Sequence, residues 1–576
     1  MSAAWVGFKA TSIKSDLQKA SDLMPTLKAQ IGANDVPAAQ GSVDSLVQLT
    51  GSARESSNDP VWKAASAIPW IGPNLQAISE VATSADDVAR LGAAPLVSAY
   101  QSLNWKHLTP SASGMDLTPL QAAAPKVQSA AHAVSESAER LENIRTDNLL
   151  PQVATPLEQA RNELSSLKQN LNTAADAARL APSMLGAESP RRYLLLVQNN
   201  AESRATGGIP GALAVLNVEK GKLVLESQTS ATALGTFLPP IEVDAEQRAI
   251  YTARMGKFMQ DVNLTPDFAT SASTAQAMWE KSSGERLDGV LSIDPVALSF
   301  ILDATGPVKI DDAAVQEIGK NLPGQLTSKN VVQTMLSDVY AKIQEPALQD
   351  IYFAGAAKQI FSALSSESSD PKKLIDALTK GVEERRILLW SSQTDEQKVI
   401  GKYPLGGMVS GPAVSPTQFG VYFNDGTGAK MDFWVRRTVQ VAKDCTRDGY
   451  REVTVRVTST NTAPSDAATS LPAYVTGGGI FGVPAGTVQT NIVAYGPAQA
   501  NIDTVVKDGI KIPFAAQRHS QRGVGSSTVR LAPGESTTMD FNFGHIVQQS
   551  RAELVVTPTT QPVKDVLQPA ATSPCE

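Results

Sequence analysis

The sequence predicts an α+β multidomain fold in which helices come first, strands alternate with helices next, and strands dominate last. Up to about residue 180, small and apolar residues recur every three or four positions, which is the period of a helix. From about 190 to 400, short apolar runs alternate with helical stretches, as in an α/β core. Beyond 400, short strand-like runs are spaced by Pro/Gly turns, which is typical of a β-sandwich.

These patterns divide the chain into four parts. We expect a helical region with a long helix hairpin over 1–185 and an α/β domain with a helical insert over 186–400. A β-sandwich over 401–556 follows, and a tail rich in Pro, Thr and Gln completes the chain over 557–576. A length of 576 residues also favours about three or four domains.

In the helical region we expect two single helices followed by a helix hairpin. Two helices are predicted near Ile13–Ile31 and Ala38–Thr50, and two apolar seams predict an antiparallel hairpin with a polar turn at 145–148. At 1.5 Å per residue, each arm of the hairpin is roughly 35 Å long. The seams consist of Leu120, Val127, Val134, Leu141 and Ile144, and of Leu157, Ala160, Leu164, Leu167, Leu171, Ala174 and Ala178. Because the second seam is rich in Ala, packing onto neighbouring helices is favoured over an independent coiled coil.

The stretch DPVWKAASAIPWIGPN, residues 59–74, lies between these helices and the hairpin. Its three prolines indicate a structural corner, since proline interrupts regular helix hydrogen bonding. Its two tryptophans, Trp62 and Trp70, are also of the residue type enriched at membrane interfaces. The sequence therefore allows either a packed corner or a surface that contacts lipid headgroups.

The α/β domain is expected to alternate short strands with helices. Strands are predicted at Tyr193–Val197, Ala212–Val218, Leu223–Gln228, Val290–Ile293 and Val308–Ile310. Helices are predicted at Thr270–Lys281, Pro295–Ala304, Asn330–Lys342, Gln349–Leu364 and Lys372–Trp390.

The β region opens with two strands around a Gly-rich loop. Phe419–Phe423 and Lys430–Val441 flank residues 424–428 and are predicted to pair as a hairpin. Arg451–Thr458 alternates polar residues with Val, which indicates a half-buried strand. Asp425 and Asp432 near the hairpin are either turn residues or calcium ligands, and a turn residue is the more common case.

Composition and motifs narrow the classes of function. A net charge of -7 and a pI near 5.4, without a basic stripe, give no support for nucleic-acid binding. Two cysteines and four scattered histidines provide no readable metal site, although one disulfide remains open. The sequence contains no GxxxxGK[ST], GxSxG, HExxH or CxxC motif. No cofactor is assigned on these grounds.

No stretch has the length needed to cross a bilayer, because the apolar residues at 3–8 fall far short of the ~20 required. They also lack the charged start and long apolar core of a signal peptide. Two interpretations follow from the residues alone. The protein is cytosolic as written, or Met1 lies just after an anchor that is missing from this chain.

The strongest candidate site is QNNAESRATGG, residues 198–208, between two predicted strands. Loops that leave a strand in an α/β sheet commonly bind ligands, and paired glycines allow close backbone approach. An arginine provides a donor fork suited to phosphate. The alternative is a solvated loop with a local ion pair. The candidate ligand-binding residues are Asn199, Asn200, Glu202, Arg204, Thr206, Gly207 and Gly208, with Arg254 as a further cation.

The segment RYLLLVQNNAESRATGG, residues 192–208, resembles the signature of domain-of-unknown-function family 4012, found in bacterial, mainly actinobacterial, cell-envelope proteins. The resemblance extends to DPVWKAASAIPWIGPN, LSDVYA at 336–341, EERRILLW at 383–390, NDGTGAKMD at 424–432 and LPAYVTG at 471–477. It implies a membrane-anchored, extracytoplasmic protein whose anchor precedes Met1. In such an oxidising location Cys445 and Cys575 would pair, which closes a loop of more than 100 residues.

A weaker resemblance links the α/β segment to the LytR-CpsA-Psr family, which transfers glycopolymers from polyprenyl-pyrophosphate carriers to the cell wall. It implies a cell-wall glycan or lipid-linked phosphate as ligand, and Mg²⁺ only if the chain is an active transferase. Here Asn200 and Thr206 stand where that family has Asp, which weakens magnesium binding. Three functions remain open: an envelope protein that binds such a ligand, a glycopolymer transferase, and a non-catalytic structural or adhesion protein.

Overall fold

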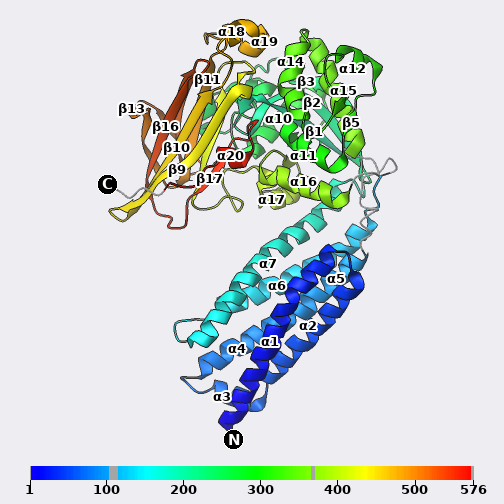
Figure 1. The fold of residues 1–576 in the computed structure, drawn as a ribbon, viewed down its shortest axis with the longest axis vertical. Coiled ribbons are helices and arrows are strands. Elements are labelled where there is room, and N and C mark those ends of the chain that lie inside the picture. The colour runs from blue at the N-terminus through cyan, green and yellow to red at the C-terminus, as the bar shows by residue number, and fades with distance from the viewer. Residues whose placement is uncertain (1, 103–113, 365–369, 572–576) are drawn as a thin grey trace. The chain divides into compact units, whose positions relative to one another are not determined.

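The computed structural model describes residues 2–102, 114–364 and 370–571 (Figure 1). The chain forms two compact units, one within residues 1–189 and one formed mainly by residues 190–576. Helices make up the first unit, whereas the second contains helices and several sheets, so the predicted α+β multidomain class is confirmed. The regions expected as two domains, 186–400 and 401–556, belong to one compact unit.

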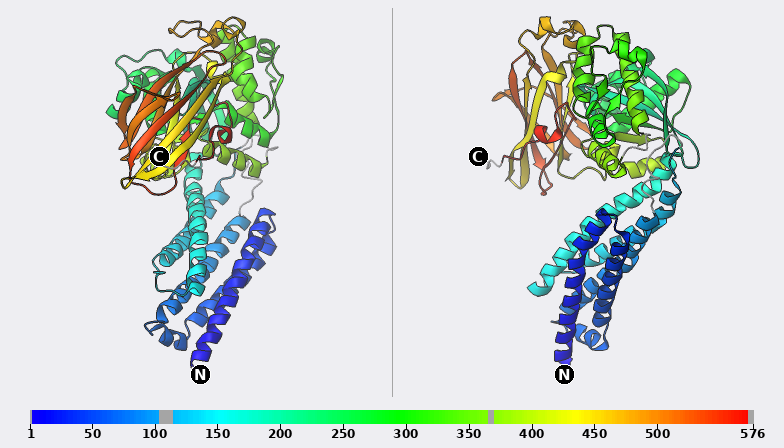
Figure 2. Two further views of the ribbon diagram at one scale, coloured as in Figure 1. Left: turned by 60° about the vertical axis from the view of Figure 1, so that its left-hand side comes forward. Right: turned by 45° about the vertical axis from the view of Figure 1, so that its right-hand side comes forward.

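The first unit consists of antiparallel helices. They are α1 (Ser2–Gly32), α2 (Val36–Ser57), α3 (Pro60–Ser66), α4 (Gly72–Asp87), the π-helical turn η1 (Val88–Ala93), α5 (Ala94–Ser102), α6 (Thr118–Glu142) and α7 (Pro151–Met184). Figure 2 shows the long helices of this unit, in blue to cyan, side by side. The predicted hairpin is α6 and α7, and its seam residues Val134, Leu141, Leu157 and Leu171 are buried.

The predicted corner at 59–74 is the α3–α4 turn. The Asp59 carboxylate accepts a hydrogen bond from the Val61 backbone N–H and begins α3. Trp62 is 1% exposed, and its indole N–H donates to Ser79 at 2.9 Å. Trp70, in contrast, is 81% exposed. One tryptophan therefore packs the corner, and the other lies on the surface.

The second unit begins with a mixed sheet of order β3-β2-β1-β4-β7. Its strands are β1 (Arg191–Arg204), β2 (Gly207–Glu219), β3 (Lys222–Ser230), β4 (Gly289–Ile293) and β7 (Leu388–Ser391). Among the described strands of this sheet, β1 and β4 form the single parallel pair. Leu194, Leu196 and Val215 from this sheet pack against Phe268, Met278 and other residues of the neighbouring helix to form one core.

Helices and short segments surround this sheet. They are η3 (Ala231–Leu234), α8 (Ala245–Tyr251), α9 (Arg254–Lys257), η4 (Met259–Asp261), α10 (Phe268–Ser283), α11 (Pro295–Thr305), α12 (Ala313–Ile318), α13 (Val331–Gln333), η5 (Thr334–Asp338), α14 (Val339–Lys342), α15 (Pro346–Leu364), α16 (Pro371–Glu383), α17 (Thr394–Ile400) and η6 (Pro404–Gly406). The strands β5 (Val308–Lys309) and β6 (Gln325–Leu326) form a separate two-stranded sheet.

Two expectations in this region are wrong in detail. The helix predicted over Lys372–Trp390 ends at Glu383, and Leu388–Ser391 instead forms β7, antiparallel to β4. The chain leaves α16 through Arg385, whose φ of +56° is not helical. The helix predicted over Asn330–Lys342 contains a π-helical turn at η5.

Two five-stranded sheets form the rest of the second unit. Their orders are β13-β12-β16-β10-β9 and β14-β15-β11-β8-β17. The strands are β8 (Gln418–Asp425), β9 (Val435–Arg447), β10 (Tyr450–Asn461), β11 (Val488–Ala498), β12 (Asn501–Lys507), β13 (Ile510–Ile512), β14 (Ala515–His519), β15 (Arg522–Leu531), β16 (Ser536–Ile546) and β17 (Glu553–Val556). Phe419, Phe423, Val455 and Phe541 belong to a single core to which both sheets contribute.

The predicted hairpin between Phe419–Phe423 and Lys430–Val441 does not form. β8 pairs with β11 and β17, whereas β9 pairs with β10 in the other sheet. The connection contains the 3-10 turn η7 (Met431–Trp434), which carries the chain from one sheet to the other. The short helices α18 (Ala467–Ser470) and α19 (Ala473–Thr476) follow β10.

The segment expected as a tail over 557–576 is ordered and packed in its described part, 557–571. Thr557 is 0% and Thr559 is 2% exposed, α20 (Val563–Val566) follows, and Leu567 forms a bridge with Val439. Hydrogen bonds to buried groups hold this segment in place. For example, the Thr557 hydroxyl donates a hydrogen bond to the Ala205 carbonyl at 3.0 Å. The predicted Cys445–Cys575 disulfide stays a prediction, since Cys575 lies outside the described residues.

None of the described helices has both the length and the apolar character needed to cross a bilayer.

Replacing Trp62 with Ala is expected to lower the free energy of unfolding of the helical unit by about 3–5 kcal/mol, because it leaves a cavity and removes the hydrogen bond to the Ser79 hydroxyl. Trp70→Ala is the matched control and should change it by less than about 0.5 kcal/mol. Urea denaturation followed by far-ultraviolet circular dichroism measures both. Equal effects of the two substitutions would show that the corner is not packed around Trp62.

Candidate functional site

The candidate segment 198–208 is not a loop but the end of a β-hairpin. β1 continues to Arg204, β2 begins at Gly207, and only Ala205 and Thr206 form the turn. A bulge between Asn199 and Ser203 interrupts the ladder. The bulge turns the polar side chains that follow it away from a simple alternation between the faces of the sheet.

The two glycines are explained by packing within this hairpin. A Cβ on Gly208 would lie 2.1 Å from the carbonyl carbon of Asn199, and one on Gly207 would lie 2.4 Å from Gln198 Oε1. Gly207 also has a φ of +141°, a region that side chains rarely allow. The sequence suggested that these glycines allow a ligand to come close. In the structure they instead allow two parts of the hairpin to come close to each other.

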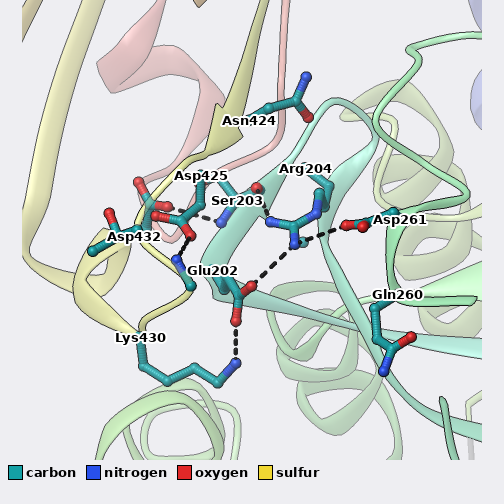
Figure 3. A network of polar contacts seen from close by, with 12 residues as sticks. Glu202, Ser203, Arg204, Gln260, Asp261, Asn424, Asp425, Lys430 and Asp432 are labelled. Carbon is teal, nitrogen blue, oxygen red and sulfur yellow. Dashed lines mark hydrogen bonds and ion pairs between the residues drawn. The ribbon is translucent and has the colours of Figure 1, made fainter. Parts of the chain in front are cut away.

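Arg204 lies in a buried network of charges (Figure 3). Its residue is 5% exposed, and one terminal nitrogen donates to Glu202 Oε1 at 3.0 Å and to Asp261 Oδ1 at 3.3 Å. The other terminal nitrogen donates to the Ser203 carbonyl at 3.0 Å. The guanidinium that the sequence suggested for phosphate binding is therefore bonded to groups of the protein itself.

Residues that follow β8 complete the network. Lys430 pairs with the second oxygen of Glu202, opposite Arg204 (Figure 3). The Ser203 backbone N–H donates to Asp432 Oδ2 at 2.8 Å, and Asp432 in turn pairs with the fully buried Arg437. These bonds attach the β1–β2 turn to residues more than 200 positions later in the chain.

The network shifts the pKa values of its members. Burial alone would raise the pKa of Glu202, but the charges of Lys430 and Arg204 outweigh it and lower the pKa. Burial likewise opposes the charge of Lys430, yet Glu202 raises its pKa. Asp425 behaves differently: burial and the negative charges of Asp432 and Glu202 raise its pKa to about 7.

The raised pKa of Asp425 favours a proton on its carboxyl, and this proton balances the buried charges of the network. The buried cations of this network are Arg204, Lys430 and Arg437, and its buried carboxyls are Glu202, Asp261, Asp425 and Asp432. With a proton on Asp425 the two sets are equal. Its Oδ2 accepts the Gly428 backbone N–H at 2.6 Å, so Asp425 is a turn residue, as the commoner of its two sequence interpretations requires.

The other predicted site residues are also engaged internally. The Asn199 side chain donates to the Tyr340 hydroxyl, and Asn200 donates to Asp294 at 3.0 Å and to the Pro558 carbonyl at 3.2 Å. The Thr206 hydroxyl accepts from Gln198 and Asn263. Arg254 does approach the group, since it pairs with Asp261 at 2.9 Å, but its side chain is 64% exposed.

Sequence reasoning missed most of the partners. Asp261, Lys430 and Arg437 bear the opposing charges, and Arg386 pairs with Asp294 at 2.9 Å. Two of these, Lys430 and Arg386, lie in the stretches NDGTGAKMD and EERRILLW that carried the family resemblance. Nothing in one sequence shows which of these charges meet.

A small pocket lies beside the β1–β2 turn. Its lining includes Thr206, Arg385, Tyr422 and Pro558, and it has room for about one water-sized group. Arg204 and Glu202 do not line it. Within the part of the chain that the structure describes, no group of three or more His, Cys, Asp or Glu side chains is arranged to hold a metal ion.

One part of this chain matches a known protein family. Residues 188–340, which contain β1, β2 and Asp261, match the family model described as Protein of unknown function (DUF4012). The resemblance expected from residues 192–208 is thus confirmed, and the DUF4012 match places Glu202 and Arg204 inside the region that defines the family. No curated protein matches the chain significantly.

Replacing Arg204 with Met is expected to lower the free energy of unfolding by about 3–5 kcal/mol, because removing one partner strands buried carboxylates. Arg254→Met removes the exposed partner of the same Asp261 and should cost less than about 1 kcal/mol. Urea denaturation of both variants is the measurement. Similar losses in the two would contradict the buried network.

The free energy of unfolding is expected to fall as pH rises from about 4 to about 7, because a raised pKa of Asp425 stabilises the folded state only while its carboxyl is protonated. Its pKa in the folded protein is about 7, against 3.8 as the ordinary value, so the folded state holds a proton that the unfolded chain has released. Asp425→Asn removes this contribution. The stability of the variant relative to the wild type should increase between pH 4 and pH 8, by on the order of 2–4 kcal/mol. Denaturation at several pH values tests this, and an unchanged difference would assign the proton elsewhere.

Proposed function

We propose that the chain is a non-catalytic structural protein of the bacterial cell envelope, extracytoplasmic and anchored to the membrane. In this proposal the unit 190–576 is a rigid body that holds its shape without a ligand in the candidate segment. The helical unit acts as a spacer at the membrane. Of the three functions left open by the sequence, this is the one that the geometry of the candidate segment favours.

One observation carries the proposal: the charged groups of the DUF4012 signature neutralise one another. Glu202 is shared between Arg204 and Lys430, and Asp261 is paired with Arg204. A pyrophosphate or an anionic glycan would need Arg204 to leave two carboxylates in a buried environment, which is costly. Both the ligand-binding and the transferase alternatives depend on that arginine being available.

Two proposals on the fold accompany this one. The two five-stranded sheets are proposed to form a β-sandwich, because Val455 and Phe541 of one and Phe419 and Phe423 of the other share a core. The likeness of the α/β part to the LytR-CpsA-Psr family is kept as a proposal about fold alone. The mixed sheet with a parallel β1–β4 pair is compatible with it.

A cluster of exposed apolar side chains supports the membrane proposal. Trp5 donates its indole N–H to Asp59, and its ring lies 6.1 Å from that of Phe8. The Leu150 backbone N–H donates to Asn74, which brings the α6–α7 turn to the same end of the helical unit as the α3–α4 turn. Trp and other large apolar residues are typical of the water–membrane interface. The exposed residues at this end are Trp5, Phe8, Val61, Ile68, Trp70 and Leu150.

The membrane proposal is tested with phospholipid vesicles and the soluble chain. Sedimentation with vesicles is expected, and the double variant Trp5→Ser, Trp70→Ser should lose at least roughly tenfold in affinity, since each exposed Trp contributes apolar area. A double substitution at exposed polar residues of the second unit, Lys309→Ser and Lys320→Ser, serves as the control. Binding that is unchanged in the Trp variant would contradict this orientation.

The non-catalytic proposal is tested by chemistry. Purified protein is incubated with a polyprenyl-pyrophosphate glycan, magnesium and peptidoglycan, and no release of lipid phosphate is expected. Release that Arg204→Met abolishes, in a variant whose fold is retained, would restore the transferase alternative. Intact-mass measurement before and after reduction decides whether Cys445 and Cys575 pair, as an oxidising location predicts.

A further inference from the structure

The pocket beside the β1–β2 turn brings together segments that are distant in sequence. Ala205 and Thr206 come from the turn, Arg385 from the link between α16 and β7, and Tyr422 from β8. Pro558 of the packed C-terminal segment adds a further wall. The space is about that of one water molecule or one monatomic ion.

Among the described residues, Arg385 has no carboxylate as an ion-pair partner, whereas its neighbour Arg386 has two. Arg386 is fully buried and pairs with Asp294 at 2.9 Å and with Glu384 at 2.8 Å. Among the described residues no ion pair or side-chain hydrogen bond involves the Arg385 guanidinium, and burial lowers its pKa, with only the hydroxyl of Tyr422 acting in the opposite direction. Its φ of +56° is unusual for a residue with a side chain, so this placement is held by the surrounding structure.

A second buried arginine in this region, Arg522, also has no carboxylate partner among the described residues. Arg522 is 3% exposed, and its three hydrogen bonds, each of 2.7 Å, go to the main-chain carbonyls of Val409, Gly496 and Gln418. Burial lowers the pKa of Arg522, and the charge of Arg385 lowers it further. No carboxylate among the described residues compensates either charge in this way.

Tyr422 provides an unused donor at the same place. The residue is 2% exposed, and its hydroxyl has no hydrogen-bond partner in the described chain. A water molecule in the pocket would satisfy that hydroxyl but would leave the positive charge uncompensated. An anion does both, because it accepts from the hydroxyl and from the guanidinium fork.

We propose that this pocket binds a small monovalent anion of about the size of chloride, held by Arg385 and Tyr422 and attracted further by Arg522. The anion would join the β1–β2 turn, the α16–β7 link and β8 at one point. This inference goes beyond the proposed function, since it assigns a ligand to the rigid unit itself. It also places the uncompensated positive charge of this region at Arg385 and Arg522, and not at Arg204.

The test compares the full chain in sodium chloride and in sodium gluconate at equal ionic strength, since gluconate is too large for the pocket. The thermal midpoint is expected to rise saturably with chloride, by roughly 2 °C at saturation, because a ligand that binds only the folded state stabilises it. Arg385→Gln should abolish this increment, and Tyr422→Phe should weaken it. Arg286→Gln, at an exposed arginine elsewhere in the unit, should leave it unchanged.

A second measurement does not depend on stability. Exchange of chloride with a bound site broadens the ³⁵Cl resonance, and the broadening should be lost in Arg385→Gln and competed by bromide. Crystals grown with bromide should show its anomalous signal between Arg385 and Tyr422. Equal midpoints in chloride and gluconate, broadening that survives in Arg385→Gln, or a water molecule in the pocket of bromide crystals would each overturn the proposal. If Arg385→Gln does not fold, the chlorine titration of Tyr422→Phe decides.

Discussion

The rest of the second unit depends on one constraint: charges that folding removes from water must be neutralised inside the protein. Arg204, Lys430 and Arg437 are all buried and paired with carboxylates, and the Lys430–Glu202 pair joins segments that are distant in the chain. Buried pairs of this kind add little net stability over apolar packing, because desolvation offsets much of the attraction. They do penalise every arrangement in which one partner is missing. The network therefore selects one mutual placement of the β1–β2 turn and the segment after β8.

That constraint explains why the α/β part and the two following sheets form one compact unit. The backbone N–H groups of Ser203 and Ala205 donate to Asp432 and Asn424, so the turn is bonded to the β region through main chain as well as side chains. A hinge at this junction would expose several charges without partners at once. The signature QNNAESRATGG is accordingly a joint between two sheet systems, and its amides and glycines serve that joint.

The fold could be predicted from the sequence wherever the signal is local. The seams of α6 and α7, the corner at Trp62 and the strands around Leu195 and Leu216 all follow from periodicity and apolar content. Pairing between distant segments could not be predicted in this way. Nothing local distinguishes a hairpin at 424–428 from a crossover between sheets, and β7 resembles the end of the helix that precedes it. The same limit applies to the candidate site. A Glu and an Arg two residues apart in a polar stretch are typical of a ligand loop, and only the positions of Asp261 and Lys430 reveal a buried joint.

The packed C-terminal segment has a consequence for how the chain is completed. Arg386 donates to the carbonyls of Thr559 and Gln561, Asn200 donates to that of Pro558, and β17 lies at the edge of its sheet beside β8. During synthesis these buried donors wait for partners that lie 173 or more residues later in the chain. The helical unit has all of its own residues early, whereas the second unit closes only when residues 553–567 have left the ribosome. A polypeptide interrupted shortly before residue 553 would contain every helix of the first unit and most strands of the second, yet would lack the piece that seals it.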